Sequence, residues 1–200
     1  MQPRASITAL ALGLWMLAPM AAAHAEHPGF EVTSTTFSSG GTLPLSMVYN
    51  ACPQYPNGGN MSPQLSWRGV PPHAVTYVVI LYDPVASFTH WGMYNISSKT
   101  TPTPGELPEN AGVADSPYGT QIANDFGDLR YDGPCPPTQL MPVSHKYVVT
   151  VYALDEKLPT LPAMGSFPPG AEALYHALIE AGRDGHILGS ASVSGFFPAQ

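Results

Sequence analysis

The stretch LYDPVASFTHWGMYNI, residues 81–96, places an acid and a histidine on either side of a short gap between two apolar runs. The run before the gap (77–82) and the run after it (91–96) both have the β-branched and aromatic composition of strands. Asp83 and His90 are therefore expected at facing strand ends. A surface hairpin can produce this arrangement by chance, whereas a binding pocket at the strand ends requires it.

The first residues have the features of an export signal. Arg4 gives a positive start, residues 7–20 are apolar, and Ala-His-Ala at 23–25 is the small-x-small pattern that signal peptidase recognises. We expect cleavage of residues 1–25, a single mature domain of residues 26–200, and a location in the periplasm or the medium. No second long apolar run follows, so no membrane segment is expected after processing.

The mature sequence is acidic and its basic residues are dispersed. Without Arg4, six basic side chains face fourteen acidic ones, a net charge of −8 with neutral histidines. The six stand singly along the chain: Arg68, Lys99, Arg130, Lys146, Lys157 and Arg183. Binding to nucleic acid or to an anionic membrane surface is therefore not expected.

Two cysteines, Cys52 and Cys135, are present in a chain with an export signal. Oxidising compartments favour disulfides, so we predict that the two are joined. Neither belongs to a C-x-x-C pair, which gives little support to zinc binding or thioredoxin-like redox chemistry. The alternative is two free thiols.

Nineteen glycines and twenty-three prolines divide the chain into short segments. Most of these have strand composition, and they cover residues 30–37, 45–49, 64–67, 76–82, 90–96, 145–153 and 187–196. One segment, 171–181, predicts a helix, because Leu174 and Leu178 share a face and Gly182 follows the last turn. Many short strands with one late helix are typical of a β-sandwich or barrel. The polar stretch 97–126 is too long for a hairpin loop, and such loops are either functional or plain surface excursions.

A second polar cluster lies in YDGPCPPTQLMPVSHKYVVTVYALD, residues 131–155. Its Gly- and Pro-rich turn precedes a strand that begins at His145. Tyr147 is two residues further on, and strand periodicity places both side chains on one face. Each residue also has an ordinary explanation: Asp83 before Pro84 can simply start a turn, and a histidine at a strand end is commonly packed and hydrogen-bonded.

Three separated motifs resemble the phosphatidylethanolamine-binding protein family. Residues 81–96 are similar to its Asp-Pro-x-Ala segment and His-Trp strand, and 131–155 to its Gly-x-x-Pro-Pro and His-Arg-Tyr signature. GGNMSPQLSWRGVP, residues 58–71, resembles the Asn-x-Ser-Pro-x-Leu-x-Trp segment of the bacterial, Raf-kinase-inhibitor-like members. Three motifs in the right order are a specific signal.

The resemblance implies a mainly β fold, an antiparallel sandwich with one or two short peripheral helices and an anion pocket at one end. The implied ligand is phosphate, phosphoethanolamine or a phospholipid head group, and the same rim is a possible contact for a protein partner that the chain would inhibit or modulate. The matching ligand-binding positions are Asp83, His90, Gly133, Pro134, His145 and Tyr147. Val85 and Ser87 depart from the family pattern, since they replace its second Asp and final Pro.

The chemistry of these residues suits an anion. Both histidines, Tyr147 and backbone N–H groups of the Gly133 turn can donate hydrogen bonds. Asp83 is expected to receive a histidine N–H or a ligand ammonium. We expect Asp83 and His90 to form one side of the pocket, His145 and Tyr147 the other, and Gly133-Pro134 the wall. With no lysine or arginine in the set, binding should strengthen as imidazole is protonated, from about pH 8 to about pH 6.

Two other classes of function use the same residues. A hydrolase or a metal-dependent enzyme could employ Asp83, His90 and His145, but the sequence has no Gly-x-Ser-x-Gly elbow, and Ser144 would face away from His145. His73, His176 and His186 are further metal-ligand candidates, scattered in separate segments. We expect a binding protein, with no cofactor, no metal and no catalysis.

Overall fold

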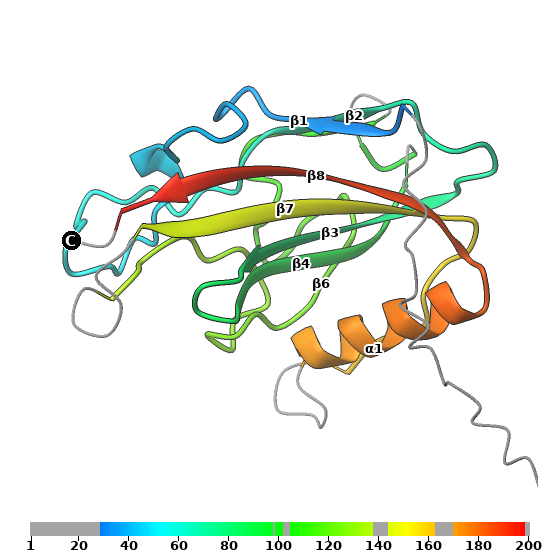
Figure 1. Ribbon diagram of the computed structural model, residues 1–200. Helices are drawn as coiled ribbons and strands as arrows, with labels where there is room; N and C mark the ends of the chain where they lie inside the picture. The colour runs from blue at the N-terminus through cyan, green and yellow to red at the C-terminus, as the bar shows by residue number, and fades with distance from the viewer. Residues whose placement is uncertain (1–28, 98, 102–104, 138–143, 163–169, 199–200) are drawn as a thin grey trace, which may run out of the picture.

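The computed structural model describes residues 29–97, 99–101, 105–137, 144–162 and 170–198. Two antiparallel sheets pack face to face (Figure 1), which confirms the predicted mainly β sandwich. The smaller sheet has the order β1 (Glu31–Thr33), β2 (Leu65–Arg68) and β5 (Glu106–Leu107). The larger has the order β6 (Thr120–Gln121), β4 (Phe88–Ile96), β3 (Thr76–Asp83), β7 (His145–Leu154) and β8 (Ile187–Phe197). The predicted signal peptide, 1–25, lies outside the described residues.

The central strand β3 is buried on both faces, which explains its continuous apolar sequence. Tyr77, Val79 and Leu81 enter the core between the two sheets. Val78 and Ile80, which point the opposite way, enter a second core beneath the helix. Strand alternation therefore gives β3 an inner face, toward the other sheet, and an outer face, toward the helix.

The helix α1 (Gly170–Arg183) confirms the segment predicted as 171–181, and it covers the outer face of the larger sheet (Figure 1). Leu174 and Leu178 are buried in the core beneath it. A Cβ at Gly92 of β4 would lie 2.4 Å from a carbon of Ile122 and 3.1 Å from one of Leu174. A glycine at this position lets the helix layer approach the sheet closely.

One predicted strand is wrong. Residues 45–49 contain a 3-10 turn, η1 (Leu45–Met47), in which the Met47 N–H donates to the Pro44 carbonyl and the Val48 N–H to the Leu45 carbonyl. Met47 and Val48 are fully buried in the core between the sheets. The apolar composition of this segment thus reflects burial of a turn, and composition alone does not separate the two cases.

The predicted disulfide between Cys52 and Cys135 is present, with the two Cα atoms 5.6 Å apart. It joins the segment that follows η1 to the Gly- and Pro-rich turn. The same two segments are also joined by a hydrogen bond from the Tyr49 N–H to the Pro134 carbonyl, 3.1 Å long. Both links fix the turn that precedes β7.

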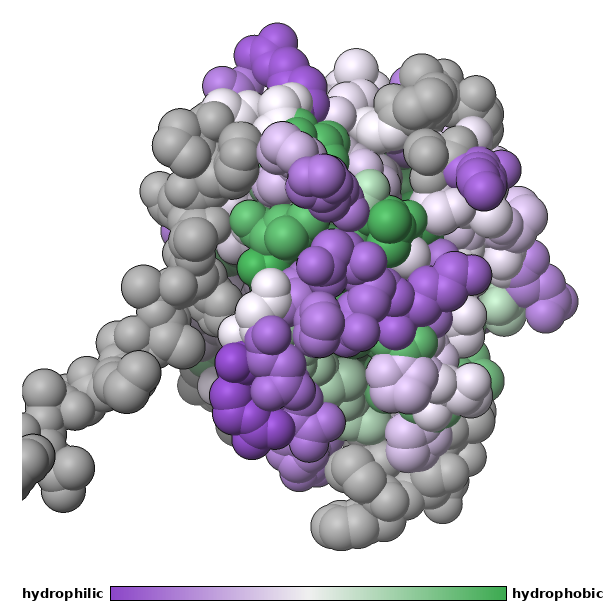
Figure 2. Space-filling view, turned by 90° about the vertical axis from the view of Figure 1, so that its right-hand side faces the viewer, coloured by the Kyte–Doolittle hydropathy of each residue, from purple (hydrophilic) through white to green (hydrophobic). Residues whose placement is uncertain are grey.

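Within the described part of the chain, no helix has the length and apolarity needed to cross a membrane. The antiparallel strands β3 and β7 run between two ends of the molecule. β3 ends and β7 begins at one of them. Figure 2 looks onto the other, where β7 and α1 end, and this surface is largely hydrophilic.

Candidate functional site

A cavity of about 280 Å³ lies where β3 ends and β7 begins. Its polar lining consists of Asp83, His90, His145 and Tyr147, all four from the set predicted from the sequence. Its apolar lining consists of Ala86, Phe88, Phe126, Cys135, Pro136 and Pro137. Gly133 and Pro134, the other two predicted residues, are not among the lining residues.

Strand alternation turns three of the four polar side chains toward the cavity. Asp83 continues the inward series of Val79 and Leu81 on β3. His145 and Tyr147 begin β7 and are both buried, whereas Lys146 between them is exposed. The prediction that His145 and Tyr147 share a face is thus confirmed.

His90 reaches the cavity through a β-bulge. In the register of β3 with β4, Leu81 pairs with Trp91 and Tyr82 with Thr89, so His90 is an extra residue without a partner. A bulge re-aims side chains, and here His90 and Trp91 are both turned inward. Trp91 is in the core between the sheets, and the His90 ring lies 5.3 Å from the ring of Tyr147, centroid to centroid.

Asp83 bonds to His145. One carboxylate oxygen, Oδ1, accepts the N–H groups of Val85 and Ala86 at 2.8 and 3.1 Å, as expected for an acid that starts a turn. The other, Oδ2, lies 2.6 Å from His145 Nδ1. Asp83 therefore both starts a turn and lines the cavity. It accepts a histidine N–H as expected, but the expected grouping of Asp83 with His90 against His145 is replaced by an Asp83–His145 pair.

The Asp83 carboxylate fixes the tautomer of His145. A carboxylate only accepts, so His145 Nδ1 carries the hydrogen and Nε2 is left as the remaining polar atom of the ring. Both His145 Nε2 and the Tyr147 hydroxyl are buried without a hydrogen-bond partner among the described residues. Unpaired buried polar atoms are uncommon and point to a missing partner.

Burial sets the protonation of two lining groups. Removal from water lowers the pKa of His90 to about 4, against the smaller opposing effects of the Asp132 carbonyl and the Asp83 charge. His90 is therefore neutral between pH 6 and 8, contrary to the expectation of an imidazolium there. Burial is the largest influence on the Tyr147 hydroxyl and raises its pKa well above the ordinary value. The charge of Asp83, and an interaction with that carboxylate whose geometry falls short of a hydrogen bond, raise it further, so the hydroxyl remains protonated and able to donate.

A buried network behind the cavity holds His90. The ring Nδ1 of His90 donates to the backbone carbonyl of Asp132 at 2.8 Å, since a carbonyl only accepts. The Asp132 carboxylate accepts from the side-chain amides of Asn60 and Asn124, both at 2.8 Å, and lies 3.1 Å from Arg130 Nε. Burial raises the pKa of Asp132, while these hydrogen bonds and the Arg130 charge oppose the rise. The sequence analysis did not select this network, although Asn60 and Asp132 both lie inside the motifs it quoted.

Gly133 and Pro134 precede the lining residues Cys135 and Pro136 in the chain and do not line the cavity themselves. A Cβ at Gly133 would lie 1.7 Å from the Met47 carbonyl oxygen, so only glycine permits this close approach. Its N–H, which the sequence suggested for anion binding, donates to Asn60 Oδ1 at 2.8 Å. The structure therefore gives Gly133 a supporting role in which its donor is already engaged.

An aromatic rim surrounds His90, and sequence reasoning missed it. The rings of Phe88 and Phe126 both contact the ring of His90 and meet each other edge to face, with 4.7 Å between their centroids. The ring of Tyr49 stacks on that of Phe126 at a centroid distance of 5.0 Å. Phe126 is 43% exposed. It is the last residue of the long polar stretch 97–126, so the length of that stretch was the available signal.

The residues considered for the enzyme and metal alternatives lie in different surroundings. Ser87 and Ser144 are not among the cavity-lining residues, and the Cys135 sulfur is in a disulfide. Asp83 and His145 bond to each other while His90 bonds to Asp132. In the ranges that the structure covers, no group of three or more His, Cys, Asp or Glu side chains is placed to hold a metal ion.

Comparison with known proteins identifies the family. Residues 33–198 match the family model described as phosphatidylethanolamine-binding protein. A UPF0098 protein of Methanothermobacter thermautotrophicus is 36% identical over 144 residues, which are 70% of this chain and 85% of the relative. UPF0098 protein YbcL of Escherichia coli is 35% identical over 142 residues, 68% of this chain and 74% of the relative.

Solved structures agree. The crystal structure of Escherichia coli YbcL, described as a new member of the mammalian PEBP family, aligns with a TM-score of 0.69 at 29% identity, over 86% of this chain and 99% of that one. A putative homologue from Chlamydia trachomatis, CT736, aligns with a TM-score of 0.63 at 28% identity and the same coverage. The chain belongs to the phosphatidylethanolamine-binding protein family.

Proposed function

We propose that this member of the family is an exported, non-catalytic binding protein that takes a phosphate-bearing molecule into the cavity between Asp83 and Tyr147. The chemistry fits free phosphate, phosphoethanolamine or a phospholipid head group. The observation that carries the proposal is the pair of buried atoms, His145 Nε2 and the Tyr147 hydroxyl, without a partner among the described residues. Leaving such a group unpaired costs about 1–3 kcal/mol, which a bound oxygen or hydroxyl would recover.

The four polar side chains differ in what they offer a phosphate. The Tyr147 hydroxyl donates to a phosphate oxygen. Because the Asp83 carboxylate accepts the Nδ1–H of His145, this tautomer presents Nε2 as an acceptor, which suits a P–OH or an ammonium group of the ligand. His90 is neutral, and because its Nδ1–H is used by Asp132, its Nε2 accepts. An acceptor at this point matches the P–OH of a phosphate monoanion or an ammonium group.

The charges on the lining favour a ligand that carries a proton. Neither lysine nor arginine is among the residues that line the described cavity, and Asp83 adds a negative charge. A phosphate dianion would meet that carboxylate without a fixed cation to offset it, and burying an unbalanced charge is costly. The monoanion of phosphate or of a monoester is the better match, with its carbon substituent against Phe88, Phe126 and Pro136.

Calorimetric titration tests the proposal. Inorganic phosphate, O-phosphoethanolamine and dimethyl phosphate are titrated into the mature protein at pH 6 and pH 8. We expect the first two to bind more tightly at pH 6 by a larger factor than dimethyl phosphate, because the diester has no P–OH that titrates in this range. Pocket binding predicts that Tyr147→Phe and His145→Gln each weaken binding by about tenfold or more, the loss of one hydrogen bond to a charged group.

The control is Lys146→Ala, which changes the exposed residue between the two pocket residues on the same strand. It should leave the affinity unchanged. Equal affinity of wild type, Tyr147→Phe and His145→Gln for every phosphate compound would reject the proposed site.

The non-catalytic part of the proposal is tested separately. The buried Asp83–His145 pair resembles a general base, but the described residues that line the cavity include no serine, threonine or free thiol as a nucleophile. We expect no hydrolysis of p-nitrophenyl phosphate or p-nitrophenyl acetate above the buffer rate. Turnover that disappears in His145→Gln and persists in Lys146→Ala would make the protein an enzyme.

A further inference from the structure

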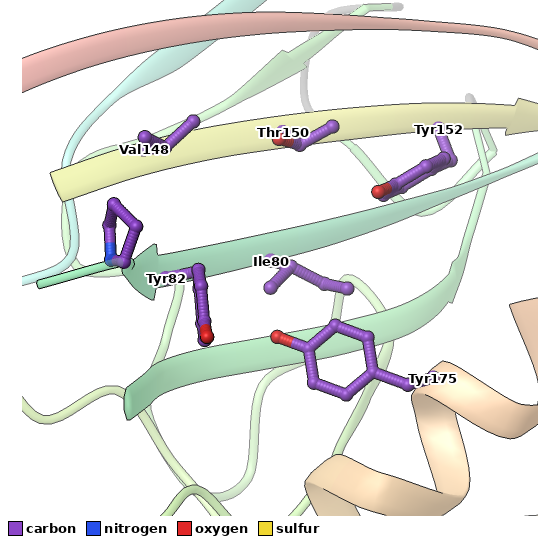
Figure 3. A pocket seen from close by; sticks show the side chains of 7 residues that line it. Ile80, Tyr82, Val148, Thr150, Tyr152 and Tyr175 are labelled. Atoms are coloured by element: carbon purple, nitrogen blue, oxygen red, sulfur yellow. The ribbon is translucent and has the colours of Figure 1, made fainter. Parts of the chain in front are cut away.

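A second and larger cavity, about 440 Å³ in volume, lies on the outer face of the same sheet, between β3, β7 and α1 (Figure 3). Consecutive residues at the end of β3 serve the two cavities. Tyr82 and Pro84 line the outer one, whereas Asp83 between them lines the inner one. Tyr175 is the residue of α1 that lines this cavity. On the outer face of β7, the lining residues Val148, Thr150 and Tyr152 are only half-buried.

The described residues that line the outer cavity carry hydroxyl groups and no charge. Its lining residues are tyrosines, a threonine and apolar side chains, and none of them is acidic or basic. Figure 3 shows the rings of Tyr82, Tyr152 and Tyr175 arranged around the space over Ile80. Tyr82 and Tyr175 meet edge to face at 6.3 Å between ring centroids.

The hydroxyl of Tyr175 is anchored and stays protonated. It lies 3.0 Å from Thr89 Oγ1. Burial is the largest influence on this phenol and raises its pKa to about 12. The Thr150 hydroxyl is similarly tied, at 2.8 Å, to Ser192 on the neighbouring strand β8. These anchored groups give the cavity fixed polar points among ring faces, which is the composition of small-molecule sites.

Charge and volume restrict what can occupy this space. A charged ligand would lose hydration, and that loss is costly. None of the described lining residues supplies a counter-charge, and the acid whose charge reaches Tyr175, Asp125, stands outside the lining. The hydroxyl oxygens of Tyr175 and Thr150, each in one hydrogen bond, can take part in a further one, so a ligand that carries a hydroxyl group matches them. The volume lies within the range of sites for small organic molecules, about 300–1,000 Å³.

We propose that the outer cavity is a second binding site, specific for an uncharged molecule of one or two rings that carries one or two hydroxyl groups. This site uses the outer face of β3 and β7, so it is independent of the phosphate site on the inner face.

The test uses 2-naphthol, an uncharged bicyclic alcohol at pH 7, and 2-naphthoate, which has the same rings and a negative charge. Protein labelled at the isoleucine, valine and threonine methyl groups is titrated with each compound and followed by NMR. We expect 2-naphthol to shift the methyl signals of Ile80, Val148 and Thr150, and 2-naphthoate to bind at least about tenfold more weakly, for lack of a counter-charge.

Two substitutions add matched aromatic bulk. Val148→Phe places a ring inside the cavity, on a half-buried strand position that tolerates aromatic residues. Ile179→Phe places it on α1, at a side chain that is 64% exposed and outside the cavity lining. Val148→Phe should weaken 2-naphthol binding by about tenfold or more, through loss of the space, and Ile179→Phe should leave it unchanged. If Val148→Phe is poorly folded, Thr150→Phe provides the same obstruction.

The outcomes separate the two sites. Binding of 2-naphthol that persists in His145→Gln, while phosphate binding is lost, supports two independent cavities. If the wild type binds no phosphate at all, 2-naphthol binding with the expected methyl shifts still supports the outer site. Equal binding of 2-naphthol and 2-naphthoate, equal effects of the Val148 and Ile179 variants, or methyl shifts absent from Ile80 and Val148 would each overturn the proposal.

Discussion

Two histidine–aspartate pairs stand at the opposite ends of β7, and they differ mainly in their exposure to water. At the pocket end, His145 Nδ1 lies 2.6 Å from Asp83 Oδ2 and both side chains are buried. At the other end, His186 Nδ1 lies 3.0 Å from Asp155 Oδ1, and the two side chains are 39% and 37% exposed. Figure 2 shows the hydrophilic surface of that second end.

The difference teaches that burial, more than contact distance, decides what such a pair does. The hydrogen bond to Asp155, aided by the charge of Glu156, raises the pKa of His186, but water solvates both groups whether or not they pair. Exposed ion pairs accordingly add little stability. In the buried pair neither group has water to replace its partner, so each depends on the other. That dependence keeps the ring of His145 in one orientation at the cavity.

The largest effect is expected from removing the acid of the buried pair. Asp83→Asn keeps an oxygen for the turn N–H groups but replaces the acceptor of His145, and it should lower the free energy of unfolding by about 3–5 kcal/mol. Asp155→Asn, the matched change at the exposed end, should have a far smaller effect. Urea unfolding at pH 7 measures both. Equal losses would show that burial does not distinguish the pairs.

The next effect is a pH dependence carried by His90. Its folded pKa of about 4 lies below the unfolded value of 6.5, so the unfolded chain binds more protons between these pH values. Stability should therefore be complete above pH 6.5 and fall as the pH drops toward 4, by up to about 3 kcal/mol. His90→Asn keeps an N–H for the Asp132 carbonyl and should flatten this dependence.

The measurement is urea unfolding at several pH values from 7 to 4, with wild type compared with His90→Asn. The exposed His186 has the opposite sign, because its folded pKa is raised: its contribution is present at low pH and is lost as the pH rises. A wild-type advantage over His90→Asn that does not shrink toward pH 4 would contradict the neutral, buried state of His90.

A smaller effect, with opposite signs for two properties, is expected at Tyr147. Tyr147→Phe removes a buried hydroxyl that lacks a partner among the described residues, so the unliganded protein should keep its stability or gain up to about 1 kcal/mol. The same change should weaken phosphate binding. Thermal unfolding without and with saturating O-phosphoethanolamine measures the two effects together. A clear loss of stability in the unliganded variant would mean that the hydroxyl has a structural partner.

The smallest effect is expected at the exposed pair. His186→Ala should leave the urea midpoint at pH 7 unchanged, because Asp155 and Glu156 remain solvated after the change. The midpoint is measured at low and at moderate salt, since screening should remove any residual difference. A drop comparable to that of Asp83→Asn would place His186 in a structural role.

Part of the site followed from local sequence. Tyr147 is two residues after His145 in a strand, so the shared face was predictable from alternation alone, and the acid at the end of β3 was predictable in the same way. A histidine N–H was expected as the partner of that acid, but which histidine supplies it was not predictable. The bulge at His90 adds one residue to β4, and strand pairing across to β7 brings His145 within bonding distance of Asp83. Neither can be read from one segment, because register depends on the whole sheet.

The mainly β class, the late helix and four of the cavity-lining residues could be predicted from the sequence, because strand and helix periodicity and short motifs are local properties. The disulfide was predicted from the export signal, since oxidising compartments favour disulfides. Only the tertiary structure decided that Gly133 supports the wall through Asn60, that Phe88 and Phe126 form the rim, and that His90 is neutral. The physical reason is that burial and hydrogen-bond pairing arise between distant segments. An aspartate and a histidine can form a solvated surface pair or a buried pair that lines a cavity, and packing alone selects between them.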